Sequence, residues 1–176
     1  MKQKATIHEH HALLSNLQQL PRKILLLHGT ENVPEFVLHE LCHEKCFNVH
    51  KAAYFVDNPD FDCLKGVAGI HHDEVMVHDD IWNNPNHFSE KMKQSLFNQR
   101  VRSMFHQSAR KKRLQEDELV DLIAKNLEMK HPKFFHWDMK HDNHGMLIID
   151  QEEDNHVWDD EYLMNSAHLL GFCPVH

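Results

Sequence analysis

The sequence predicts a single α/β domain over residues 1–176, with a small mixed sheet and helices packed on that sheet. Two apolar runs, at about 23–28 and 47–57, are typical of buried strands, and a helical pattern lies between them. A strand, a helix and a strand with short connections form a βαβ unit. We therefore expect these two strands to be parallel.

The other elements of the N-terminal half follow from spacing and from prolines. A first helix is expected at 5–20, where leucines recur with helical spacing, and Pro21 is expected to end it. The helix between the two strands covers 30–46, with a proline and acidic residues suited to its first turn. The stretch 59–86 lacks a regular pattern, so we expect irregular structure with a short strand at 74–78.

The C-terminal half is expected to contain three helices and a hairpin. The helices cover 87–113, 115–130 and 158–170, where apolar residues recur with helical spacing. The segments KFFHWDM (133–139) and GMLIIDQ (145–151) flank a polar turn. This arrangement predicts a C-terminal β-hairpin.

Composition restricts the classes of partner. The formal net charge is −8, which disfavours non-specific binding to nucleic acid. The sequence has no apolar run long enough to span a membrane, and its first residues lack the apolar core of a signal peptide. The four cysteines have no C-x-x-C spacing, so we expect a cytoplasmic protein with reduced thiols. The oligomeric state stays open.

Histidine is the unusual residue, with 19 copies, and it is the commonest metal ligand in proteins. The segment HELCH, residues 39–43, fits the pattern H-E-x-x-H on a predicted helix. This segment and the apolar residues before it resemble the zinc metallopeptidase (zincin) motif. The resemblance implies a metal-dependent hydrolase in which His39 and His43 bind Zn²⁺ and Glu40 is the catalytic general base. His50 or a carboxylate would complete the ligand set.

The same helix also allows a non-catalytic metal site. The side chains of His39, Cys42, His43 and Cys46 lie on one helical stripe and offer ligands for Zn²⁺ or another transition metal. A single helix cannot surround an ion, so His50 is the nearest further ligand. The structural alternative is that both cysteines are small core residues and both histidines are half-buried.

A third class of function is the binding of a small molecule or an anion without a metal. In open α/β sheets ligands bind at the carboxyl ends of the strands, which are here His28 and Asp57. The sequence contains no G-x-S-x-G, G-x-G-x-x-G or P-loop pattern, which excludes the α/β-hydrolase and glycine-loop nucleotide-binding classes.

The predicted hairpin carries a further set of candidate ligand-binding residues. His136 and Asp138 share one face of a strand, and the turn brings His141 and His144 near them. A metal or another ligand can bind there, although solvated turn residues would give the same pattern. The segment 71–73, His-His-Asp, offers a similar but sparser set.

Overall fold

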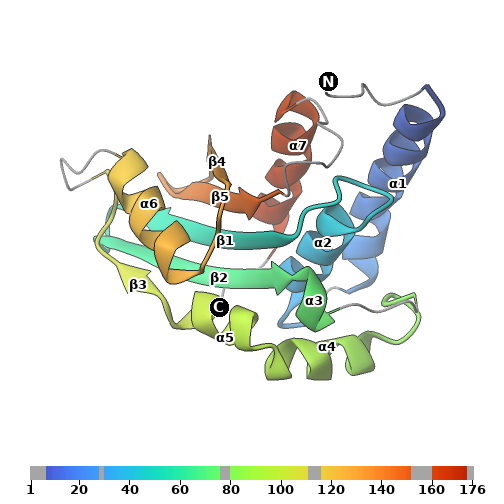
Figure 1. Ribbon diagram of the computed structural model, residues 1–176, viewed down its shortest axis with the longest axis horizontal. Coiled ribbons are helices and arrows are strands. Elements are labelled where there is room, and N and C mark those ends of the chain that lie inside the picture. Colours follow the sequence, from blue (N-terminus) through green and yellow to red (C-terminus); the bar gives the residue numbers. More distant parts are fainter. Residues whose placement is uncertain (1–6, 28–29, 76–79, 111–115, 152–159, 174–176) are drawn as a thin grey trace.

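The computed structural model describes residues 7–27, 30–75, 80–110, 116–151 and 160–173. These residues form a five-stranded sheet of order β3-β2-β1-β5-β4, in which every pair of neighbours is antiparallel (Figure 1). In chain order the elements are α1 (Ile7–Leu26), α2 (Val33–Cys42), β1 (Lys51–Asn58), β2 (Cys63–His71), α3 (His72–Val75), α4 (Pro85–Gln94), α5 (Leu96–Ser103), β3 (Phe105–His106), α6 (Glu116–Asn126), β4 (Pro132–Asp138), β5 (His144–Asp150), α7 (Asp160–Ala167) and the 3-10 helix η1 (His168–Phe172). Within the described ranges, no helix is both long and apolar enough to cross a membrane.

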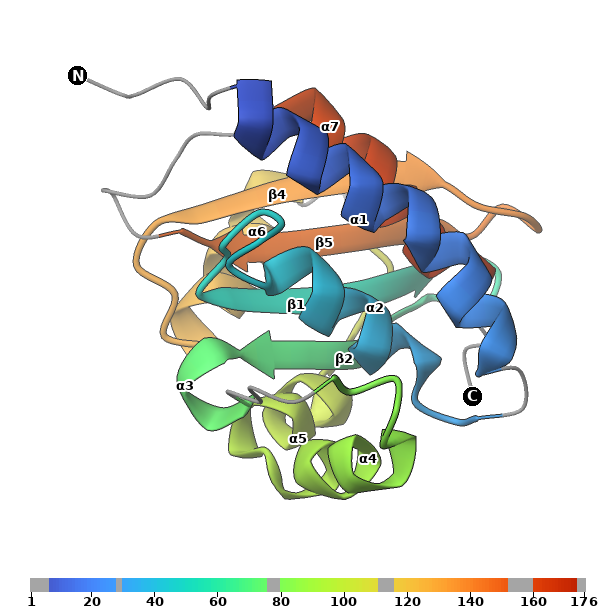
Figure 2. The ribbon, with the colours of Figure 1, turned by 90° about the vertical axis from the view of Figure 1, so that its right-hand side faces the viewer.

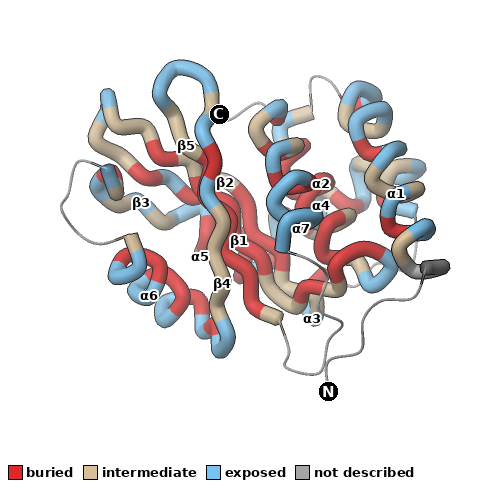
Figure 3. The backbone as a smooth tube through the Cα atoms, turned by 90° about the horizontal axis from the view of Figure 1, so that it is seen from above, coloured by how far each residue is buried: buried red, intermediate tan, exposed pale blue. Residues whose placement is uncertain are grey.

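Helices cover both faces of the sheet. Figure 2 shows α1, α2 and α7 in front of the strands and α6 behind them. One apolar cluster joins α1, α2, α4, α7 and η1 to the sheet, and a second cluster joins α5 and α6 to the opposite face. The central strands therefore lie buried between two helical layers (Figure 3).

Strand β1 contributes to both apolar clusters because its side chains alternate between the faces. Ala52 and Tyr54 belong to the cluster under α1 and α2, whereas Ala53 and Phe55 belong to the cluster under α5 and α6. A strand buried on both faces has a continuous apolar sequence, which is the pattern usually associated with parallel sheets. That similarity explains why the sequence suggested a parallel strand at this position.

The predicted parallel βαβ unit is wrong. Residues 23–26 are the last turn of α1, which continues through Pro21, and the partners of β1 are β2 and β5, both antiparallel. Leu25 and Leu26 are 74% and 78% exposed, so this apolar run is not a buried strand. A short apolar run does not distinguish a helix from a strand. Proline removes one backbone hydrogen bond of a helix, and this loss does not always end the helix.

The predicted irregular stretch contains β2, which the sequence analysis missed. Its signal is weak because the strand includes two glycines, Gly66 and Gly69. Helix α5 approaches so closely that a Cβ atom on Gly66 would lie 1.8 Å from the carbonyl oxygen of Val101. A Cβ atom on Gly69 would lie 2.6 Å from a methyl carbon of the same valine. The contact with α5 therefore requires the small residues that obscure the strand pattern.

The C-terminal hairpin is confirmed, because β4 and β5 pair along their full lengths. The expected helix at 87–113 is instead two helices that meet at Ser95, whose hydroxyl accepts a hydrogen bond from the amide of Asn98 at the start of α5. The second helix ends at Ser103, β3 follows it, and residues 111–113 lie outside the described residues. The expected strand at 74–78 begins within α3, and residues 76–79 lie outside the described residues.

Candidate functional site

The two histidines of the HELCH segment lie side by side at the C-terminal end of α2. Helix α2 ends at Cys42, and His43 is its C-cap residue, whose ψ of 148° turns the chain out of the helix after the second histidine. The two imidazole centroids are 6.0 Å apart. Burial, together with the nearby His43 and His72, lowers the pKa of His39 to about 4, and its Nδ1 atom has no hydrogen-bond partner among the described residues.

The carboxylate of Glu40 is held by two side chains from other parts of the fold. The indole N–H of Trp82 donates a hydrogen bond to Oε1 of Glu40, and Nζ of Lys23 lies 3.5 Å from the same oxygen. These contacts connect α2 to α1 and to the segment before α4. Glu40 therefore has a structural role here.

The two cysteines near the end of α2 are core residues. Cys42 and Cys46 are both 3% exposed, and burial raises the pKa of both thiols far above the ordinary value. Metals bind the thiolate form, which burial disfavours at these positions. All four cysteines of the chain are free.

A different group of predicted residues comes together at one end of the sheet. Asp57 of β1 pairs with His144 of β5, and His144 pairs with Asp138 of β4, so the three residues form a row across adjacent strands. His136 lies two residues before Asp138 on β4, so its side chain is on the same face of the sheet. This row borders a pocket of about 80 Å³, which we call the Asp57 pocket. The pocket is lined by Asp57, Ala109, Arg110, Glu116, His136, His144, Gly145 and Met146.

Ion pairs surround the Asp57 pocket, but they leave Asp57 itself partly unsatisfied. Asp138 Oδ1 lies 2.9 Å from His144 Nδ1 and 3.3 Å from an Arg110 nitrogen. His136 Nδ1 lies 3.3 Å from Glu116 Oε1. Asp57 is only 3% exposed, and its Oδ1 accepts no hydrogen bond from any described residue. The arrangement offers an unused acceptor beside histidine and arginine donors.

The remaining predicted ligand residues lie elsewhere. His141 is exposed in the β4–β5 turn with a φ of 60°, and it does not line the Asp57 pocket. His28 lies outside the described residues. His50 is far along β1 from Asp57, next to the first residue of the strand.

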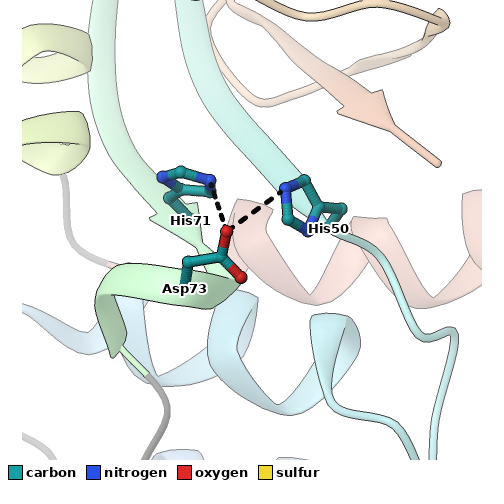
Figure 4. Close-up of side chains that lie close together, drawn as sticks. All are labelled: His50, His71 and Asp73. Carbon is teal, nitrogen blue, oxygen red and sulfur yellow. Dashed lines mark ion pairs between the residues drawn. The ribbon is translucent and has the colours of Figure 1, made fainter. Parts of the chain in front are cut away.

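His50 lies in a second group, which we call the His50 cluster: His50, His71 and Asp73 (Figure 4). Nε2 of His50 and Nε2 of His71 lie 3.8 Å and 3.7 Å from the same oxygen of Asp73. Among the described residues this is the group whose nitrogen and carboxylate atoms are close enough to hold a metal ion, and it contains no residue of HELCH.

The architecture defines a class of α/β protein with a five-stranded antiparallel sheet between two helical layers. Within that class, the chain is similar to the GAF domain from a phosphoenolpyruvate-protein phosphotransferase of Coxiella burnetii. The match has a TM-score of 0.50 and 12% sequence identity, and it covers 92% of each chain. The fold is therefore GAF-like. No protein-family model matches the sequence, and no curated protein matches it significantly.

The structure gives no support to the predicted zinc hydrolase, because the group of described residues that could hold a metal ion contains no residue of HELCH. The predicted general base, Glu40, contacts Trp82 and Lys23.

The structure brings together several residues that no pattern in the sequence connects. Arg110 and Glu116 reach the Asp57 pocket from segments distant in the sequence, and no local pattern connects them to Asp57. His71 and Asp73 did stand out as a histidine–aspartate run. Their relation to His50 depends on the antiparallel pairing of β1 with β2, which the predicted parallel topology did not contain.

Proposed function

We propose that this protein binds a small polar molecule in the Asp57 pocket. The GAF-like fold favours a small-molecule ligand. The observation that carries the proposal is the buried carboxylate of Asp57, with an oxygen that accepts no hydrogen bond from the described residues. Burial of an unsatisfied charged group costs stability, so its position beside a pocket indicates a role in binding.

The position of Asp57 also suits a binding residue. It is held near the end of a central strand, with neighbouring strands hydrogen-bonded on both sides. His144, on the next strand, is oriented by its contact with Asp138. Binding side chains that lie on strands and are oriented by hydrogen bonds to neighbouring side chains are positioned more rigidly than side chains on a loop.

The pocket chemistry indicates the ligand class. Asp57 needs a donor, such as a hydroxyl or amino group, whereas Arg110 and His144 can bind an anionic group. The volume of about 80 Å³ is about half that of a cavity that holds benzene, so only a few non-hydrogen atoms enter it. Small hydroxy acids and small amino acids meet these requirements.

The test is titration calorimetry with glycolate, lactate, glycine and serine on the wild type and on Asp57→Asn. Asparagine keeps the shape of the side chain but removes the charge. We expect at least one of these molecules to bind the wild type and to bind Asp57→Asn at least about tenfold more weakly, the effect of losing a charged hydrogen bond. Arg110→Gln should weaken the binding of the same molecule.

The matched control is Asp60→Asn, which changes an exposed aspartate in the turn after β1. This variant should bind the ligand as the wild type does. Equal affinity of Asp57→Asn and wild type would place the site elsewhere, and failure of all four molecules to bind would reject the ligand class.

A further inference from the structure

The His50 cluster lies at the opposite end of β1 from the Asp57 pocket. His50 immediately precedes β1, His71 is the last residue of β2, and Asp73 is in the first turn of α3. Figure 4 shows both imidazole rings directed toward one carboxylate. We propose that these three side chains bind a divalent first-row transition-metal ion, a site separate from that of the proposed function.

The backbone fixes the separation of the two histidines. Lys51 pairs with His71 across the β1–β2 ladder, so His50 lies just beyond the paired residues. The amide of His50 donates to the carbonyl oxygen of Asp150 over 3.1 Å, and the amide of His72 donates to the carbonyl oxygen of His50 over 2.9 Å. The strand ends therefore hold the histidines in place without requiring a bound ion.

The distances within the cluster suit a metal ion. Ligand atoms about 2.1 Å from a tetrahedral ion lie about 3.4 Å from one another. The two histidine nitrogens are 3.8 Å and 3.7 Å from Oδ2 of Asp73, so small side-chain rotations bring all three to binding distance. Two imidazoles and one carboxylate form a ligand set used for divalent iron and related ions.

Glu74 provides a second, independent feature of a metal site. Its Oε1 lies 3.5 Å from Nδ1 of His71, which directs the other ring nitrogen toward Asp73. Glu74 is itself fixed, because its Oε2 accepts hydrogen bonds from the Ser95 hydroxyl at 2.7 Å and from the Phe97 amide at 3.0 Å. Metal-bound histidines commonly have such a carboxylate behind them.

The surroundings leave room for further ligands on the ion. The side chains of His50 and His71 are 25% and 21% exposed, whereas that of Asp73 is 70% exposed. The two histidines also line a pocket of about 370 Å³ at this end of the sheet. A metal ion with three protein ligands and one solvent-facing position can bind water or a small molecule as its fourth ligand.

The experiment is titration of the full chain with Co²⁺, followed by paramagnetic broadening of backbone amide signals in NMR spectra. This readout locates the ion, which is necessary in a chain with 19 histidines. At one equivalent or less, we expect broadening centred on residues 50 and 71–73. Broadening centred on 39–43, or no selective broadening up to one equivalent, would overturn the proposal.

Three variants separate ligation from structure. Asp73→Asn changes an exposed side chain, so it should leave the amide spectrum otherwise intact while lowering Co²⁺ affinity at least about tenfold. Glu74→Gln should lower the affinity about 10- to 100-fold, as expected for a group that orients a ligand. His87→Ala, in an exposed position on α4, is the matched control and should bind as the wild type does. Wild-type affinity in a correctly folded Asp73→Asn would contradict the proposed site.

Discussion

The end of α2 and the His50 cluster carry the same kinds of side chain but use them differently. In α2, Glu40 is bound by Trp82 and Lys23, and the neighbouring cysteines are buried in the core. In the His50 cluster, two imidazoles face one largely exposed carboxylate. Strand register, rather than spacing along the chain, has brought the second set of ligand atoms together.

Burial accounts for the difference in chemistry. Desolvation disfavours the protonated form of His39 and the thiolate forms of Cys42 and Cys46. Burial therefore favours the neutral forms of His39, Cys42 and Cys46. The comparison predicts that changes in α2 alter stability, and that changes in the His50 cluster or in the Asp57 pocket alter binding.

The largest effect is expected for Leu41→Ala, within HELCH. Leu41 is 2% exposed, so its truncation should lower the free energy of unfolding by about 3 kcal/mol in urea denaturation. Leu122→Ala, at a position 48% exposed, is the control and should cost less than about 1 kcal/mol. Co²⁺ affinity of folded Leu41→Ala should equal that of the wild type. A selective loss of Co²⁺ binding would indicate that α2 contributes to the metal site.

The next effect is a pH dependence caused by His39. Its pKa is about 4 in the folded protein and near 6.5 in the unfolded chain, so the unfolded chain binds the extra proton first. Stability from this residue is complete above pH 6.5 and falls as the pH decreases toward 4, by at most about 3 kcal/mol. His39→Gln should remove this part of the decline in urea denaturation series between pH 7 and 4.

His87→Gln is the control for that series, because His87 is exposed. It should retain the pH dependence of the wild type. An unchanged decline in His39→Gln would show that the folded state does not lower the pKa of His39.

The smallest effect has the opposite sign. Asp57→Asn removes a buried charge with an unsatisfied oxygen, so it should raise the free energy of unfolding by about 1 kcal/mol while it weakens ligand binding. Thermal and urea denaturation without ligand measure the change, and Asp60→Asn should change stability by less than about 0.5 kcal/mol. A loss of stability in Asp57→Asn would indicate that the carboxylate has a structural partner.

The sequence predicted the elements with local signals and failed where distant packing decides. The β4–β5 hairpin follows from two apolar segments that flank a polar turn, and it is present. Strand β2 escaped prediction because Gly66 and Gly69 are required by the approach of α5, a contact invisible in the local sequence. The direction of β1 was wrong because burial on both faces removes the alternation that marks antiparallel strands.

The candidate residues show the same division. Asp57 was proposed as a strand-end residue, whereas His136, Asp138 and His144 were proposed as a separate hairpin site. The antiparallel pairing of β1 with β5 brings these four together. Because that pairing joins segments far apart in the chain, no local spacing could have indicated it. Whether they bind a ligand stays a prediction.

The strand order has a consequence for the folding kinetics. Strands β1 and β2 form one local hairpin, and β4 and β5 form another. The β1–β5 ladder joins the two hairpins, and its strands are farther apart in the sequence than those of any other pair in the described sheet. Closing a long loop carries an entropic cost that local hairpins avoid. Because Asp57 and His144 face each other across that ladder, the Asp57 pocket cannot exist in any intermediate that contains only the separate hairpins.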